Sequence, residues 1–215
     1  MVYHFSDNKS IIGPILIELR DVQIQKDSMR FRKNLERLGE LIAYEVSKKL
    51  EYHTELVTTP LGEASEFQLT QQPILATILR AGLPMHQGFL NVFDKADSAF
   101  ISAYRKQLNN EDFQIQIEYV AAPSLDMRVL IIIDPMLATG SSMVSVYKAL
   151  LTQGNPSKVI IVSAIASPEA LEFVKQHLPE KTDYYIGAID LELTAQSYIV
   201  PGIGDAGDLA FGIKC

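Results

Sequence analysis

An acidic residue and a run of small residues stand together in the segment DPMLATGSS, residues 134–142. The apolar run VLIII just before it predicts a buried strand that ends on Asp134. The residues from Ser141 onward predict a helix, and the free N–H groups and dipole at a helix start favour a phosphate. Gly140 lets the backbone approach such a ligand closely. The segment therefore predicts a sugar-phosphate site in which Asp134 accepts hydrogen bonds from hydroxyls. The alternative is a plain helix start, with Asp134 as a local cap.

Two arginines stand at the ends of other predicted strands. Arg80 follows the apolar run PILATIL, and Arg105 ends the segment SAYR. A single arginine in such a place is typical of a surface ion pair. Two of them beside an anion site favour a clamp for phosphate or diphosphate, because a guanidinium binds such oxygens in a bidentate manner.

The carboxyl-terminal segment YIVPGIGDAGDLAFG is rich in glycine and matches G-x-G-x-x-G at residues 202–207. A dinucleotide-binding fingerprint needs a strand–helix–strand unit of about 30 residues. Only residues 208–215 follow the motif, so that function is excluded. No G-x-x-x-x-G-K-[ST] motif is present, which argues against a P-loop NTPase. The segment is either a surface turn or a loop that presents backbone groups and Asp205 to a planar ligand.

The elements that position these residues alternate along the chain. Helices are predicted over 27–50, with Asp27 or Ser28 as N-cap, over 80–93 with Pro84 in the first turn, over 141–151, and over 168–178 with Ser167 as N-cap. Strands are predicted over 73–79, 98–105, 113–123, 129–134, 158–166 and 183–190. This order predicts an α/β fold with a mainly parallel sheet flanked by helices. The first 70 and last 20 residues fit the alternation less well and are expected to cover the active face.

Composition limits the function further. The chain has 215 residues, of which 47% are hydrophobic, and its net charge of −7 argues against a nucleic-acid partner. We expect a single domain over residues 1–215. Cys215 is the only cysteine, which agrees with a reducing compartment, and four scattered histidines give no zinc spacing. We found no secretory segment and no apolar run long enough for a membrane span, so we expect a soluble, cytoplasmic protein with no membrane partner.

The motifs ILRAGL, AYRK, IDPMLATGSS and YIVPGIGDAGDLAFG together resemble the uracil phosphoribosyltransferases, as do LRD at Leu19–Asp21 and the following FRKNLERLGELIAYE. The resemblance covers nearly the whole chain. It implies transfer of the phosphoribosyl group from 5-phosphoribosyl 1-diphosphate (PRPP) to uracil, giving UMP and diphosphate in pyrimidine salvage. It also implies a phosphoribosyltransferase-like sheet and a hood built from the N- and C-terminal segments.

The resemblance assigns site residues by motif. Catalytic roles fall to Asp205 and Arg105. PRPP binding is implied for Arg80, Arg105, Asp134, Pro135, Met136, Leu137, Ala138, Thr139, Gly140, Ser141, Ser142 and Asp205. Uracil binding is implied for Ile199, Gly204, Asp205 and Ala206. The implied cofactor is Mg²⁺, held mainly through PRPP, with no metal site of the protein's own. GTP as an effector and a homodimer or homotetramer are further implied.

The sequence departs from the family pattern at three places: Ser141, Pro84 and Leu209. Residues 106–125 match only loosely. Two other functions stay open. One is a nucleotide-sensing regulator that keeps the fold without catalysis, although an RNA-binding regulator would be expected to show a basic face. The other is transfer to another base, such as a purine.

Overall fold

The computed structural model describes residues 1–107 and 113–214. Its centre is a mainly parallel sheet in which only the β5–β6 pair is antiparallel. In spatial order the strands are β1 (Val2–His4), β10 (Asp183–Ile189), β9 (Lys158–Ala166), β7 (Val129–Ile133), β4 (Ile74–Leu79), β5 (Asp97–Gln107) and β6 (Phe113–Ala121), with β8 (Met136–Leu137) beside β9. The predicted α/β class is confirmed.

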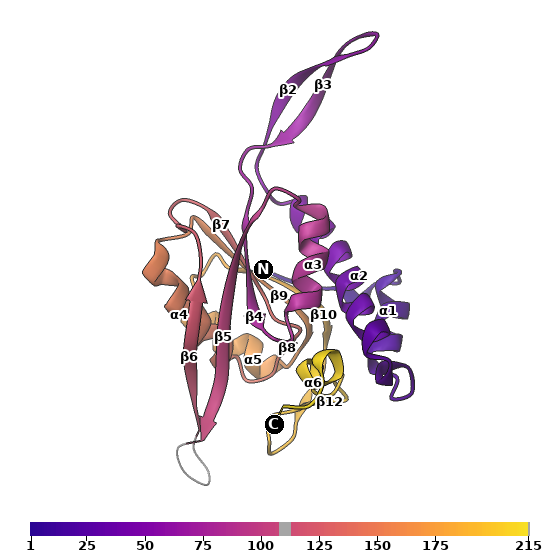
Figure 1. The fold of residues 1–215 in the computed structure, drawn as a ribbon, viewed down its shortest axis with the longest axis vertical. Helices are drawn as coiled ribbons and strands as arrows, with labels where there is room; N and C mark the ends of the chain where they lie inside the picture. Colours follow the sequence, from indigo (N-terminus) through magenta and orange to yellow (C-terminus); the bar gives the residue numbers. More distant parts are fainter. Residues whose placement is uncertain (108–112, 215) are drawn as a thin grey trace.

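Helices cover both faces of this sheet (Figure 1). One layer holds α1 (Ile12–Arg20), α2 (Ser28–Ser47) and α3 (Leu83–Val92); the other holds α4 (Ser141–Leu150) and α5 (Pro168–His177). Side chains of β7 alternate between the two layers. Ile131 and Ile133 belong to the core under α1–α3, and Leu130 and Ile132 to the core under α4 and α5. This is why a wholly apolar run was needed: a central parallel strand is buried on both faces.

The predicted helix starts are confirmed. Asp27 caps α2 by accepting from the N–H groups of Met29 and Arg30 at 3.0 and 3.1 Å. Ser167 caps α5 in the same way, and Pro84 lies in the first turn of α3, where its missing N–H costs no helical bond. No helix among the described residues is both long and apolar enough to cross a membrane.

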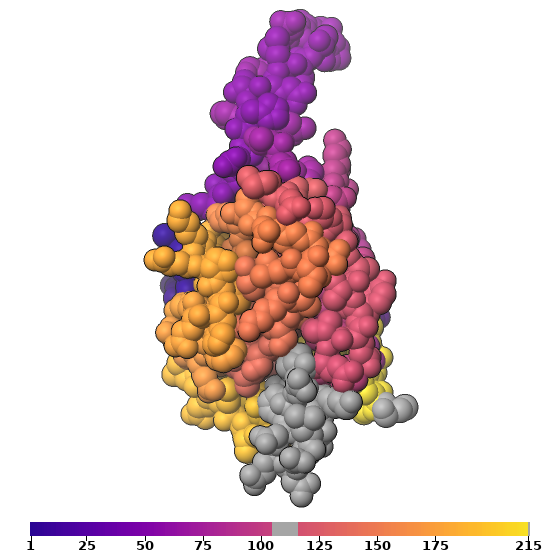
Figure 2. Space-filling model, turned by 90° about the vertical axis from the view of Figure 1, so that its left-hand side faces the viewer, coloured from indigo at the N-terminus to yellow at the C-terminus, as the bar shows by residue number. Residues whose placement is uncertain are grey.

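One element was not predicted. Strands β2 (Tyr52–Thr59) and β3 (Gly62–Leu69) pair as an antiparallel hairpin that stands clear of the body of the molecule (Figures 1 and 2). Nearly all of its residues are exposed. No element was expected in this part of the chain. The sign of it in the sequence is the Pro60–Leu61–Gly62 turn after a segment that contains threonine and valine.

The two ends of the chain meet over one edge of the sheet. The C-terminal segment forms β11 (Glu192–Leu193), β12 (Ile199–Val200) and α6 (Ala206–Phe211), and the N-terminal part adds the short 3₁₀ turns Phe5–Asp7 and Ile24–Lys26; a third, Leu151–Gln153, follows α4. Arg32 of α2 donates to the Ala210 carbonyl of α6 at 2.6 Å. The expected association of N- and C-terminal segments is therefore present.

Candidate active site

A hollow of about 470 Å³ lies at the carboxyl ends of the parallel strands, where ligands bind in open α/β sheets. The ends of β4, β5 and β7 contribute to its wall, together with the two segments around Tyr198 and Asp205. A second hollow of about 50 Å³ at the start of α4 shares residues with the first. Between them they bring together the predicted residues Arg80, Asp134, Met136, Leu137, Ala138, Thr139, Gly140, Ser142, Asp205 and Ala206.

The loop before α4 has the close backbone approach that the sequence predicted. Gly140 has a φ of +80°, and a Cβ there would lie 2.9 Å from Val174 Cγ1 and 3.1 Å from the Ala170 carbonyl oxygen. A side chain is thus excluded both by conformation and by packing against α5. Gly140 supplies no side-chain cap to α4. The start of the helix therefore presents N–H groups, which suits an anion.

Asp134 follows β7 and does not cap α4. Its Oδ1 accepts a long hydrogen bond of 3.4 Å from Met136 N–H. Burial raises the pKa of Asp134 to about 7, and the Met136 N–H offsets this only in part. A half-buried carboxyl with so little local hydrogen bonding is suited to accept donors from a ligand.

Arg80 reaches the same hollow from the end of β4. Its Nη2 donates to Asp208 Oδ1 at 3.2 Å and to the Gly212 carbonyl at 3.1 Å, whereas its buried Nε has no partner among the described residues. The small residues after it are required by packing: a Cβ at Gly82 would collide with Thr77 Oγ1. Arg80 also lines the hollow, so its guanidinium places positive charge where an anionic ligand would lie.

Asp205 faces the hollow from the opposite wall, in the glycine-rich segment. It is the N-cap of α6, where its Oδ1 accepts from Asp208 N–H at 2.9 Å. A Cβ at Gly207 would lie 3.9 Å from Ala81 Cβ, which shows how closely this segment approaches the Arg80 loop. Cationic and anionic side chains from segments far apart in the sequence thus surround one hollow.

Comparison with known proteins decides the family. The family model "Uracil phosphoribosyltransferase" matches residues 7–213. The chain belongs to the uracil phosphoribosyltransferase family. A uracil phosphoribosyltransferase from Porphyromonas gingivalis is 53% identical over 213 residues, covering 99% of both chains. Another from Pyrococcus furiosus is 36% identical, covering 98% of this chain and 90% of that one.

Solved structures agree with this family. The AQ2163 protein from Aquifex aeolicus superposes with a TM-score of 0.87 at 30% identity, covering 99% of each chain. A hypoxanthine phosphoribosyltransferase from Staphylococcus aureus gives a TM-score of 0.51 at 13% identity, covering 75% of this chain and 76% of that one. The latter likeness shows only that the uracil phosphoribosyltransferase family shares a fold with enzymes named for another base.

Some family-predicted residues do not line either hollow. Pro135 is buried, and its carbonyl accepts from Ile165 N–H at 3.0 Å. Ser141 contacts Thr139, whose Oγ1 lies 3.3 Å from the Ser141 Oγ. Ile199 lies in the core, and Gly204 is exposed with a φ of +78°. The backbone of Arg105 lies in β5, but its side chain falls outside the described residues, so its role stays a prediction.

Other residues of the site were not predicted. Ile78, Tyr104, Ser197, Tyr198 and Lys214 all line the larger hollow. Ile78, Tyr104 and Tyr198 stand within the quoted motifs, but the motifs assigned them no role. Ser197 and Lys214 lie outside every quoted motif. The hydrogen bond from Tyr104 to Glu118 of β6, together with burial, raises the pKa of the Tyr104 phenol. Lys214 adds a cation beside Arg80 to the wall of this hollow.

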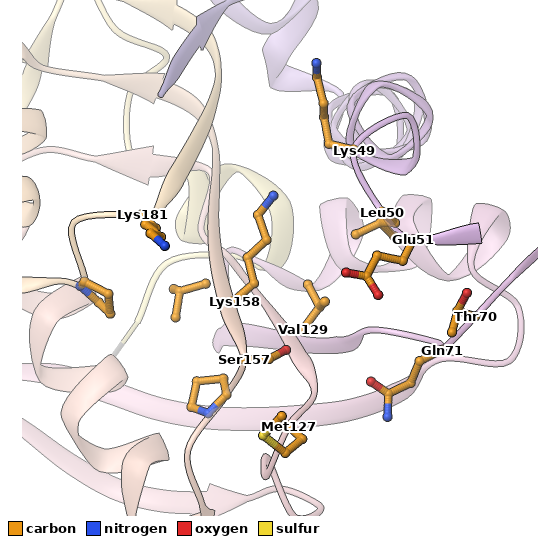
Figure 3. A pocket seen from close by; sticks show the side chains of 13 residues that line it. Lys49, Leu50, Glu51, Thr70, Gln71, Met127, Val129, Ser157, Lys158 and Lys181 are labelled. Atoms are coloured by element: carbon orange, nitrogen blue, oxygen red, sulfur yellow. The ribbon is translucent and has the colours of Figure 1, made fainter. Parts of the chain in front are cut away.

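A still larger hollow of about 570 Å³ lies elsewhere, at the root of the β2–β3 hairpin and the amino ends of β7 and β9 (Figure 3). Lys49, Lys158 and Lys181 are among the residues that line it, from separate segments. Lys158 is already paired with Asp183 at 2.8 Å. Size alone does not identify the site here, because the predicted sugar-phosphate loop and Arg80 lie at the opposite ends of the strands.

Proposed function

We propose that this protein transfers the phosphoribosyl group of PRPP to uracil, giving UMP and diphosphate, as one domain acting in cytoplasmic pyrimidine salvage. The observation that carries the proposal is the shared hollow of Arg80, Asp134, Asp205 and the α4 loop. Its carboxylate, its guanidinium and its row of N–H groups match a molecule with hydroxyls, a diphosphate and a phosphate.

Each part of PRPP has a proposed partner. The loop 135–142 holds the 5-phosphate through backbone N–H groups and the hydroxyls of Thr139, Ser141 and Ser142. Asp134 accepts hydrogen bonds from the ribose hydroxyls. Arg80 and Arg105 bind the diphosphate. Because Asp208 and the Gly212 carbonyl already hold Arg80, its guanidinium is positioned before substrate arrives.

Uracil is proposed to bind the segment around Ile199, Gly204, Asp205 and Ala206, largely through backbone atoms. A backbone donor or acceptor has no rotamers to order, so it recognises a planar ring edge at a low entropic cost. The positive φ of Gly204 places its peptide groups in an orientation that other residues adopt rarely.

The reaction needs no covalent enzyme intermediate. The bond between ribose C1 and the diphosphate oxygen breaks, and the electron pair leaves with diphosphate. Uracil N1 forms the new bond to C1 and loses its proton, which balances the reaction by passing to the departing diphosphate. Positive charge develops on the ribose ring and negative charge on the leaving group. Asp205 faces the former and Arg80 the latter, so catalysis comes from positioning and electrostatics.

The site fits a magnesium ion that arrives with PRPP. Asp134 and Asp205 are carboxylates on the wall of the same hollow, and Mg²⁺ prefers oxygen ligands while keeping several waters. The substrate would hold the ion, and these two residues would reach it through water. When bound, the ion neutralises charge on the diphosphate.

The proposed function is tested by one assay with PRPP and Mg²⁺, using uracil, cytosine, hypoxanthine or adenine, with and without GTP. We expect diphosphate release with uracil alone. Turnover with a purine would contradict the base assignment, and nucleotide binding without turnover would favour a regulator.

In the same assay, Asp205→Asn is expected to lower kcat by about 10- to 100-fold while KM changes little, because the amide keeps the α6 cap but loses the charge.

We propose further that the protein is a homodimer or larger homo-oligomer. The hairpin leaves Leu56 and Phe67 63% and 79% exposed. An isolated two-stranded hairpin is marginal in water, so a second copy is expected to cover it. Light scattering is expected to give at least twice the chain mass of 23.9 kDa. Phe67→Glu should lower that mass, whereas Tyr44→Glu, another exposed aromatic, should not; a monomeric wild type would contradict the proposal.

A further inference from the structure

Residue 202, in the middle of the segment assigned to uracil, is held on both sides by a single ion pair. Arg20, the last residue of α1, donates from Nη1 to the Gly202 carbonyl at 3.0 Å. Asp190, which follows β10, accepts from the Gly202 N–H at 2.8 Å. Both backbone groups of one residue are therefore bound by charged side chains, which makes these hydrogen bonds stronger than neutral ones.

The ion pair itself is firmly held. Arg20 and Asp190 form a bidentate contact, with Nη1–Oδ2 and Nη2–Oδ1 distances of 2.7 and 2.9 Å. Asp190 is 6% exposed, so removing Arg20 would leave a buried carboxylate without its cation. The planar fork of arginine fits this carboxylate in one orientation, which a lysine cannot reproduce.

The same N-terminal segment makes a second contact with the base-binding segment. Gln25 donates to the Leu19 carbonyl at 2.8 Å and to the Ile203 carbonyl at 3.4 Å. The backbone at Gly202 has a φ of +59°, and a Cβ there would collide with the Ile199 carbonyl oxygen. The turn between the proposed uracil contacts is thus tight and is held from outside the hollow.

Neither Arg20 nor Asp190 is among the residues that line the hollow. We propose that they are positioning residues, which set the backbone of residues 199–206 in the register that binds uracil. The proposal rests on the proposed uracil site. Uracil contacts made by backbone atoms cannot be adjusted by rotamer changes, so a shift of the segment by about 1 Å is enough to cost roughly 100-fold.

The test compares Arg20→Lys and Asp190→Asn with the wild type. Both are expected to raise KM for uracil at least tenfold, to leave KM for PRPP within twofold, and to lower the preference for uracil over cytosine. The double variant is expected to have a KM for uracil no higher than that of the more impaired single variant, because the two residues act as one unit. A purely structural role would lower the melting temperature without separating the two KM values.

Arg30→Lys is the matched control. Arg30 of α2 forms the same kind of bidentate pair with Glu18 of α1, at 2.7 Å for both bonds, but it does not contact Gly202. The proposal would be overturned if the KM for uracil were no higher in Arg20→Lys than in Arg30→Lys. It would also be overturned if the KM values for uracil and PRPP rose together. If Asp190→Asn does not fold, Arg20→Lys decides alone. A wild type without uracil turnover would overturn the proposed function instead, and this inference with it.

Discussion

Replacing Arg80 by alanine is expected to lower kcat/KM for PRPP by about a thousandfold. The proposed role of Arg80 is to neutralise charge that grows on the leaving diphosphate, and removing one such preorganised donor costs about 10²- to 10³-fold. Because Arg80→Ala also removes a full charge, we expect a loss at the upper end of this 10²- to 10³-fold range. Arg80→Lys keeps the charge but not the fork, so we expect a smaller loss of about tenfold. Steady-state kinetics with PRPP varied at saturating uracil measures both.

Arg128 offers a matched control at the opposite edge of the sheet. Its Nη2 donates to Asp97 and to the Gln72 carbonyl, both at 3.0 Å, so it makes one carboxylate and one carbonyl contact just as Arg80 does. Arg128→Ala should lower the melting temperature about as much as Arg80→Ala and leave KM for PRPP unchanged. Equal kinetic losses in the two variants would mean that Arg80 acts only through stability.

The sequence predicted the site because of a geometric rule. Asp134 and Arg80 each follow an apolar run, and the carboxyl ends of parallel strands meet at one edge of the sheet. Their meeting in one hollow therefore followed from two local patterns, although 53 residues separate them in the sequence. Gly140 was predicted for the same reason, since a helix start that receives an anion requires close backbone approach.

Other features left no local pattern to find. The hairpin 52–69 buries neither face, so no apolar alternation marks its strands. Arg20 and Asp190 pair across 170 positions, and nothing in the sequence around either one distinguishes it from other charged residues. Lys214 reaches the hollow only because α6 folds back over the sheet edge. Such contacts depend on the tertiary fold, which a single sequence constrains only weakly at its ends.

Replacing Asp134 by asparagine is expected to lower kcat/KM for PRPP by about 100- to 1,000-fold. The carboxylate is proposed to accept hydrogen bonds from ribose hydroxyls, and bonds to a charged group contribute about 1.5–3 kcal/mol each. Asparagine keeps the shape but offers one acceptor oxygen and two unwanted donors. Isothermal titration with PRPP and Mg²⁺ measures the binding part of this loss directly.

Asp134 is expected to make both folding stability and PRPP binding depend on pH. The pKa of Asp134 is raised to about 7 in the folded protein from an ordinary value of 3.8. The contribution of protonated Asp134 to the free energy of unfolding is therefore fully present below pH ~4 and is lost as the pH rises through 7. Hydroxyl donors bind the ionised form, so the wild type should bind PRPP more tightly at pH 8 than at pH 6, and binding near pH 7 should release a proton from Asp134. In Asp134→Asn both effects are expected to be absent.

The ratio of wild-type to variant affinity isolates Asp134, because ionisation of the PRPP phosphates affects both proteins equally. We expect this ratio to grow between pH 6 and pH 8. Without PRPP, Asp134→Asn should melt at a higher temperature than the wild type at pH 8, since it no longer holds a buried charge. A higher melting temperature together with a weaker affinity for PRPP is expected when a site residue lowers stability until its ligand binds. A ratio that stays flat with pH would assign the ribose hydroxyls to another acceptor, and a lower melting temperature in the variant would mean that the carboxylate is already paired in the free protein.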